Sequence, residues 1–285
     1  MKKRSLPHKF MIGLQRAGST YTYGLFEQHP NVSLSNLKEI GFYSDSSKYD
    51  KGVDWYLDTF ERDGDKIDIS PKYFMKPDEV LPRMKNTLKK KNPKFLLILR
   101  NPIYYIYSHF KYHHGYDYFK NNPQLYPKYS KDLITFLKMY PSYLDRADYY
   151  NILTKKWFKY YDPSCFKIVI FEDFIKNPKN YIEEVNIFFE LDNIELKNNP
   201  IDQNARKPFK IIYLLTEWVN KYPTLKQMLY KNTLFVKMYK AFILNFREEP
   251  NKKEIAFLKE RYAEQVKKLS TLSPKALAYW TEFKD

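Results

Sequence analysis

The residues best suited to chemistry lie in a short polar stretch that follows the first apolar segment of the chain. The stretch reads Gly13-Leu14-Gln15-Arg16-Ala17-Gly18-Ser19-Thr20-Tyr21. A strand–turn–helix corner of this kind offers unpaired backbone N–H groups and a helix dipole to an anion. Gly18 allows close approach to a phosphate, and Arg16 adds charge-assisted donors. The alternative is a plain corner in which Ser19 caps the helix.

A second candidate anion site follows another apolar segment. It reads Leu99-Arg100-Asn101-Pro102, and Ser108 comes eight residues after the arginine. Because open α/β sheets bind ligands at the carboxyl ends of their strands, Arg100 and Ser108 are suited to hold one phosphate together. The alternative is a serine that bonds to its own helix backbone.

The pattern of apolar residues predicts the elements that must position these two sites. Apolar runs predict buried strands at 9–13, 95–99 and 166–171, and 66–69 is a further short strand candidate. Helical spacing predicts helices at 19–28, 76–90, 103–113, 145–160 and 252–269. In the helix over 145–160, Tyr149, Leu153 and Trp157 share one face. Apolar strands separated by helices favour a parallel sheet that is covered on both faces, which is an α/β fold.

The two candidate sites together resemble those of sulfotransferases that use 3′-phosphoadenosine 5′-phosphosulfate (PAPS). A strand, Q-[KR]-x-G-[ST]-[ST] and a helix ending in His-Pro are similar to the family's 5′-phosphosulfate loop. Here the pattern runs from Gln15 to Thr20 and ends at His29-Pro30. The later strand ending in R-[DN]-P, with Ser108 eight positions after Arg100, resembles the family's 3′-phosphate site.

Further segments resemble the glycan-modifying branch of this family, which includes the heparan sulfate sulfotransferases. The stretch Asn36 to Tyr43 is similar to that branch's K-E-x-x-[FY]-[FY] segment. Other similar segments, in chain order, are 51–56, 70–74, 149–157, 171–174 and 260–280. The resemblance implies a P-loop-like three-layer α/β fold with a central parallel sheet. We predict a single domain over 1–285, with a nucleotide-binding core over 1–200 and a mainly helical part over 201–285.

The resemblance also implies a reaction. A sulfuryl group passes in line from PAPS to a hydroxyl or amine of a glycan, glycolipid or similar acceptor, leaving adenosine 3′,5′-bisphosphate (PAP). Glu39 is the implied general base, Lys38 lies beside it, and Arg16 stabilises the charge that develops on the bridging oxygen. No metal is expected. The implied donor contacts are Gln15, Arg16, Ala17, Gly18, Ser19, Thr20, Tyr21, Arg100, Ser108, Arg206 and Lys207.

Other interpretations of these residues stay open. Glu39 on its own would read as an exposed loop acid, and Arg206 and Lys207 fit a solvated basic loop equally well. His113 follows Ser108 closely enough to line an acceptor cleft, with a structural role as the alternative.

The chain departs from the family pattern at three positions. Arg16 stands where the family usually has lysine, which keeps the charge but spreads it over a planar fork. Ile69 stands where the glycan branch usually has lysine before Ser-Pro or Thr-Pro, so we assign acceptor binding to Lys72, three residues on. Tyr105 replaces a second arginine that often follows Arg100.

The charge of the chain fits an anionic donor. With 49 Lys and Arg against 33 Asp and Glu, the formal charge is +16, which concentrates anionic ligands. A single cysteine, Cys165, excludes an intrachain disulfide and a cysteine-based metal site. No apolar stretch reaches the roughly 18 residues that span a bilayer. We predict a cytoplasmic protein, with peripheral membrane contact left open.

Two rival functions remain. A P-loop phosphoryl-transfer enzyme requires lysine after the last loop glycine, where this chain has Ser19, and a metal-binding acid, for which Asp173 is the candidate. A basic module that binds nucleic acid or another polyanion fits the charge and the 27 tyrosines. Because no RNA-module signature appears and the basic residues are spread along the chain, we expect no nucleic-acid partner.

Overall fold

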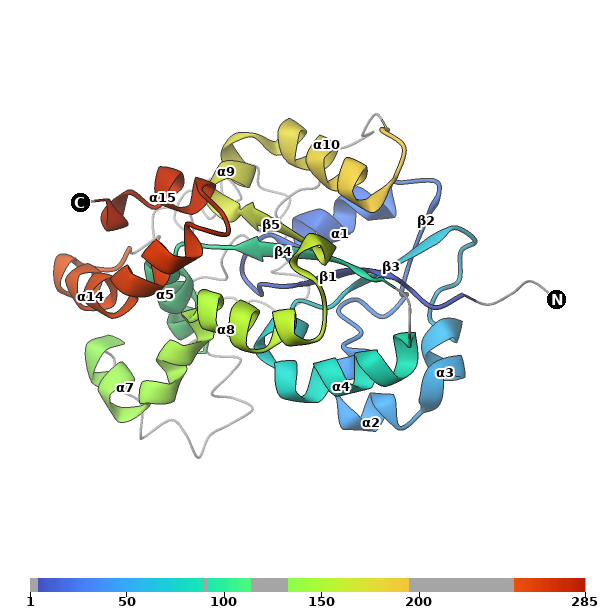
Figure 1. Cartoon of the computed structure of the whole chain (residues 1–285), viewed down its shortest axis with the longest axis horizontal. Coiled ribbons are helices and arrows are strands. Elements are labelled where there is room, and N and C mark those ends of the chain that lie inside the picture. Colours follow the sequence, from blue (N-terminus) through green and yellow to red (C-terminus); the bar gives the residue numbers. More distant parts are fainter. Residues whose placement is uncertain (1–4, 90–91, 114–132, 195–248, 285) are drawn as a thin grey trace, which may run out of the picture.

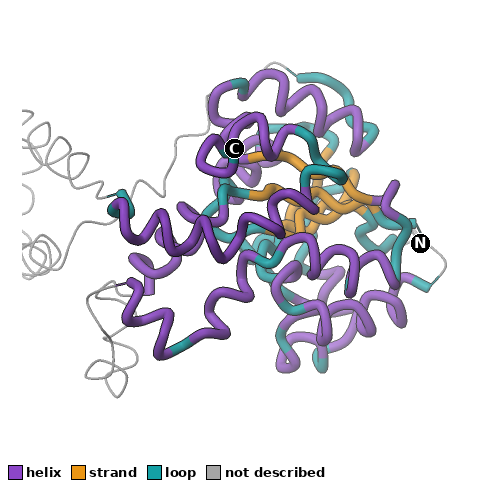
Figure 2. Tube along the Cα trace, turned by 60° about the vertical axis from the view of Figure 1, so that its left-hand side comes forward, coloured by secondary structure: helices purple, strands orange, loops and turns teal. Residues whose placement is uncertain are grey.

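The computed structural model describes residues 5–89, 92–113, 133–194 and 249–284. Its centre is a five-stranded sheet in the order β2-β3-β1-β4-β5, in which every pair of neighbours is parallel. The strands are β1 (Lys9–Gly13), β2 (Val32–Leu34), β3 (Asp65–Ile69), β4 (Lys94–Leu99) and β5 (Phe166–Ile170). Helices cover both faces of the sheet, which confirms the predicted α/β fold class (Figures 1 and 2).

The order of the strands in the sheet reverses at β1. The chain first builds β2 and β3 on one side of β1 and then crosses to build β4 and β5 on the other. The carboxyl ends of β1 and β4 therefore lie at the point where the strand order reverses, which is where open α/β sheets bind ligands. The backbone N–H of Leu14, just past β1, donates to the carbonyl of Ile98 in β4 at 3.0 Å.

The helices pack around the sheet in two layers. Figure 1 shows α10 above the sheet and α4 and α8 below it. The larger helices are α1 (Ser19–Glu27), α4 (Pro77–Leu88), α5 (Pro102–His113), α10 (Pro178–Phe189) and α14 (Lys252–Leu269). The shorter ones are α2 (Ser46–Tyr49), α3 (Gly52–Asp58), α7 (Leu133–Met139), α8 (Tyr149–Lys155), α9 (Phe171–Lys176) and α15 (Lys275–Tyr279).

The described C-terminal helices pack against the core. Helix α14 contacts α5 and α8, and the hydroxyl of Tyr262 donates to the carbonyl of Leu144 at 2.6 Å. Asn251 and Glu254 form a reciprocal capping box at the start of α14, which fixes that end of the helix locally. That the whole chain forms one domain stays a prediction.

The predicted helix over 145–160 is wrong as a single element. The segment divides into a 3-10 turn (Pro141–Ala147), helix α8 and another 3-10 turn (Trp157–Lys159). Its predicted apolar face is nevertheless buried. Tyr149 donates to the Arg100 carbonyl at 2.9 Å, and Trp157 Nε1 donates to the Phe74 carbonyl at 3.3 Å. These bonds to distant elements accompany the breaks, so tertiary contacts here outweigh helical spacing.

Candidate active site

The loop between β1 and α1 is the first part of the candidate site. Gly18 is the N-cap of α1 and has a φ of 87°, the left-handed conformation that favours glycine. A Cβ at this position would lie 2.5 Å from Cε1 of Phe174, so the site accepts only glycine without a shift. The first helical bond runs from the Thr22 N–H to the Gly18 carbonyl at 3.0 Å. The N–H groups earlier in the turn have no partner within the helix, which makes them donors for an anion.

Arg16 connects this loop to the second predicted anion site. Nη1 of Arg100, at the end of β4, donates to the carbonyl oxygen of Arg16 at 3.0 Å. Arg16 itself has a φ of 65°. A left-handed non-glycine residue costs about 1–3 kcal/mol and persists only where its surroundings determine it. The two segments that the sequence marked as anion sites therefore meet at the carboxyl ends of β1 and β4.

Arg100 and the neighbouring Asn101 are held by residues from distant elements. Its guanidinium lies 5.0 Å from the ring centroid of Phe171, and its carbonyl accepts the bond from Tyr149. The neighbouring backbone N–H of Asn101 donates to Glu172 at 3.0 Å, and Trp280 Nε1 donates to the other oxygen of Glu172 at 2.8 Å. Burial raises the pKa of Glu172. One carboxylate thus ties the end of β4 to α9 and to the C-terminal part of the chain.

Sequence reasoning assigned no role to these supporting residues. The segment 171–174 and Trp280 belong to motifs that resemble the family, but the resemblance gave them no contact. Phe174 packs against Gly18 and its ring centroid lies 5.0 Å from that of Tyr21. The contacts of Phe174 and Glu172 could not be predicted from residue spacing, because both side chains contact loops that are far away in the sequence.

The segment that bears Lys38 and Glu39 lies over the first turn of α1. Ser19 Oγ donates to Glu39 Oε1 at 3.3 Å, and Lys38 Nζ donates to Thr20 Oγ1 at 3.1 Å. Lys38 also lies 5.9 Å from the ring centroid of Tyr23. Glu39 is half-buried, whereas Lys38 is exposed. A carboxylate able to accept a proton and an ammonium group thus border the same helix N-terminus.

The structure leaves the roles of the other predicted site residues untested. Ser108 is buried in α5, and Lys72 is exposed just before a 3-10 turn, while Ile69 ends β3 as a buried residue. The described contacts join neither Ser108 nor Lys72 to the loop. Three further assignments lie outside the described residues: the side chain of His113, Arg206 and Lys207.

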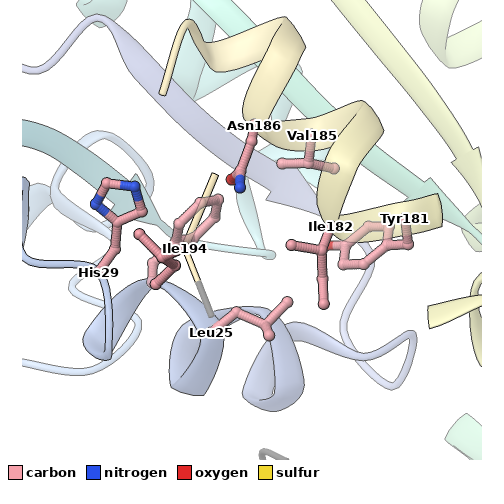
Figure 3. A pocket seen from close by; sticks show the side chains of 8 residues that line it. Leu25, His29, Tyr181, Ile182, Val185, Asn186 and Ile194 are labelled. Carbon is pink, nitrogen blue, oxygen red and sulfur yellow. The ribbon is translucent and has the colours of Figure 1, made fainter. Parts of the chain in front are cut away.

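A small apolar pocket lies away from this site. Figure 3 shows it between the end of α1, which contributes Leu25, and α10, which contributes Ile182. His29 borders it with both ring nitrogens bonded. The Asn31 N–H donates to Nδ1 at 3.2 Å, so Nε2 carries the proton and donates to the Asp192 carbonyl at 3.0 Å. This places His29 in a structural role.

Two negative findings concern the described residues alone. Within 5–89, 92–113, 133–194 and 249–284, no group of three His, Cys, Asp or Glu side chains is arranged to hold a metal ion. None of the helices in that part of the chain is both long and apolar enough to cross a membrane. The prediction of metal-free transfer stays a prediction.

Comparison with known proteins agrees with this geometry. The family described as "Sulfotransferase domain" matches residues 6–270. Membrane-associated sulfotransferase kil1 of Dictyostelium discoideum is 31% identical over 123 residues, which are 41% of this chain and 25% of that protein. Bifunctional heparan sulfate N-deacetylase/N-sulfotransferase 2 of Homo sapiens is 29% identical over 198 residues, which are 64% of this chain and 22% of that protein. The chain thus spans a quarter or less of either relative's length.

A solved structure supports the fold over nearly the whole chain. The sulfotransferase from Alicyclobacillus acidocaldarius superposes with a TM-score of 0.64 and 14% identity, covering 97% of this chain and 99% of that one. At that identity the likeness concerns the fold. The match of the family over residues 6–270 decides the classification. The chain belongs to the sulfotransferase family.

Proposed function

We propose that this chain transfers a sulfuryl group from PAPS to a hydroxyl or amine of a glycan or a similar acceptor. One observation carries the proposal: the 3.0 Å hydrogen bond from Arg100 Nη1 to the Arg16 carbonyl joins two basic segments at the carboxyl ends of β1 and β4. PAPS carries a phosphate at the 3′ position and a phosphosulfate at the 5′ position of one ribose, so it requires two such anion sites close together. Curated relatives named as heparan sulfate N-sulfotransferases support a glycan acceptor.

The residues present fit the donor. The N–H groups at the start of α1 and the left-handed Gly18 suit the 5′-phosphosulfate, and Arg100 suits the 3′-phosphate. PAPS supplies the sulfuryl group and a 5′-phosphate that leaves with the electrons of the broken S–O bond. Arg16 is the cation assigned to the charge that grows on the leaving oxygen. Ser108, Arg206 and Lys207 remain proposed donor contacts.

Glu39 is the proposed general base. As the acceptor oxygen or nitrogen bonds to sulfur, it loses a proton, and the Glu39 carboxylate takes that proton. Its 3.3 Å contact with Ser19 Oγ, in the first turn of α1, supports a position beside the transferred group. Lys38 is proposed to neutralise part of the charge on the sulfuryl oxygens, and Lys72 and His113 are proposed acceptor contacts.

Two measurements test the proposal separately. Titration calorimetry with PAP tests the donor site without any acceptor, and absence of heat would contradict it. Transfer of labelled sulfate from PAPS is then measured on N-desulfated heparin, which offers an amine, and on fully desulfated, N-acetylated heparin, which offers only hydroxyls. Transfer to neither probe would contradict the glycan assignment.

A variant tests the base. Glu39→Gln should lower kcat by about 10²–10⁴-fold while PAP binding is retained, because a general base acts only on the acceptor's proton. Glu27→Gln is the matched control, since Glu27 is an exposed acid at the other end of the same helix. Full activity of Glu39→Gln would refute the assigned role.

A further inference from the structure

Asp68 is a completely buried carboxylate that the proposed transfer does not use. It lies in β3 with 0% of its surface exposed. Oδ1 accepts a bond from Ser70 Oγ at 2.6 Å, and Oδ2 accepts bonds from the hydroxyls of Tyr56 at 2.7 Å and Tyr73 at 2.8 Å. Burial raises the pKa of Asp68, which the three hydroxyl donors oppose. A carboxylate buried at this cost requires an explanation.

Two of these hydroxyls also bind the segment that carries Glu39. The Gly41 N–H donates to Ser70 Oγ at 2.9 Å, and the Tyr43 N–H donates to the Tyr73 hydroxyl at 3.3 Å. A backbone N–H can only donate, so both hydroxyl oxygens must accept. Each hydroxyl therefore has its single proton left for another acceptor, and Asp68 is that acceptor. The carboxylate fixes the direction of both bonds to the segment.

The segment from Glu39 to Tyr43 is also held by side chains from other parts of the chain. Glu39 has a φ of 52° and Gly41 a φ of 63°, both left-handed. Lys48 Nζ donates to the Ile40 carbonyl at 2.6 Å, and Arg83 Nη1 donates to the Tyr43 carbonyl at 3.0 Å. A non-glycine residue stays in the left-handed region only where such surroundings determine it.

We propose that Asp68 is a positioning residue for Glu39. Acting through Ser70 and Tyr73, it holds residues 39–43 in the conformation that presents the Glu39 carboxylate at the first turn of α1. This inference rests on the proposed function, in which Glu39 takes the acceptor's proton. In this relay, which runs from Asp68 through the hydroxyls of Ser70 and Tyr73 to the backbone of residues 39–43, the buried group must only accept hydrogen bonds. A group that donates would compete with the two backbone N–H groups for the hydroxyl oxygens.

The chain offers a matched pair of variants. Tyr56 and Tyr73 are both completely buried, and both donate to the same oxygen of Asp68. Only Tyr73 reaches a backbone group of residues 39–43. Phenylalanine retains the ring that each tyrosine packs against this segment. The ring centroids of Tyr56 and Phe42 lie 4.2 Å apart in a stacked contact. Those of Tyr73 and Tyr43 lie 5.7 Å apart in an edge contact. Each Tyr→Phe change removes one bond to Asp68, and Tyr73→Phe alone releases the Tyr43 N–H.

The expected result separates positioning from stability. Both variants should lose stability in urea, Tyr73→Phe somewhat more, because it also removes the acceptor of the buried Tyr43 N–H. Tyr73→Phe should lower kcat about tenfold or more, with PAP affinity within about twofold of wild type, because a small misplacement of a reacting group costs rate rather than donor binding. Tyr56→Phe should keep kcat within about twofold. Equal losses of kcat in the two variants would overturn the proposal.

Two further readouts keep failure of this proposal distinct from failure of the proposed function. Hydrogen exchange of the Tyr43 amide, which requires no acceptor, should be faster in Tyr73→Phe than in Tyr56→Phe; unchanged exchange would overturn the relay. In the Glu39→Gln background, Tyr73→Phe should cause no further loss of kcat, and an undiminished tenfold loss there would show that it acts independently of Glu39. If Glu39→Gln alone is fully active, Glu39 is not the base and the positioning role fails with it, whereas the proposed function fails only if PAP does not bind or no sulfate is transferred.

Discussion

Substitution of Gly18 by alanine tests whether the loop after β1 approaches its surroundings as closely as the structure indicates. The new Cβ would lie 2.5 Å from Cε1 of Phe174, well inside van der Waals contact, at a φ of 87°. The left-handed backbone costs about 1–2 kcal/mol for an L residue. Overpacking of a tight site adds about 1–3 kcal/mol. We therefore expect Gly18→Ala to lower the free energy of unfolding by about 2–5 kcal/mol.

Gly52 provides the control that isolates the clash. Its φ is 85°, close to that of Gly18, but a Cβ there would meet no atom within 4 Å. Gly52→Ala thus pays the backbone cost alone, about 1–2 kcal/mol. The effect of alanine on the unfolded chain is similar at both positions and cancels in the comparison. The difference between the two variants, about 1–3 kcal/mol, measures the contact with Phe174.

Urea denaturation of both variants, with PAP titration calorimetry of the folded proteins, is the assay. Gly18→Ala should also weaken PAP binding at least tenfold, because the loop must move away from Phe174 and its N–H groups with it, whereas Gly52→Ala should leave PAP affinity unchanged. Equal losses of stability in the two variants would refute the close approach. Unchanged PAP affinity in Gly18→Ala would refute the role of the loop as the phosphate site.

Two further predictions concern the end of β4. Arg100→Lys keeps the charge but loses the planar guanidinium, which lets one side chain bond the Arg16 carbonyl and a phosphate together. PAP affinity should fall about 10- to 100-fold, as expected for loss of a charge-assisted hydrogen bond. Unchanged affinity by calorimetry would contradict the shared site. Burial raises the pKa of Glu172 above its ordinary value of 4.5, so the folded state binds more protons than the unfolded state in the pH window above 4.5. The free energy of unfolding of the wild type, relative to Glu172→Gln, should therefore fall as pH rises through that window in a series of denaturation curves, and a rise would mean that the pKa is lowered.

The structure bears out the local predictions closely. The first strand and helix α14 have the predicted bounds, 9–13 and 252–269. Each depends on neighbours in the sequence: a continuous apolar run in the first case, and the capping box of Asn251 and Glu254 in the second. The strand β2 was not predicted, because three residues give too short a pattern. The residues of the proposed phosphosulfate loop were likewise selected from their order along the chain, and their role stays a prediction.

Other features exist only because distant elements pack together. The predicted helix over 145–160 is broken, although its spacing is helical, and Tyr149 and Trp157 within it bond to distant carbonyl groups. Asp68 in β3 reads as an ordinary polar residue of a short strand. Its three hydroxyl partners meet it only after β3 and its neighbours have packed together.

The sequence by itself determined which residue types are available for the proposed chemistry and most of the elements that carry them. The residue types at Arg16, Glu39 and Arg100 follow an ordered set of motifs, and apolar periodicity placed each at the end of a strand or in a loop. Only the tertiary structure decided that Arg16 and Arg100, 84 residues apart, share a hydrogen bond and that Glu39 reaches Ser19. The physical reason is that periodicity is a local property, whereas the partner of a polar group depends on the order of the strands in the sheet.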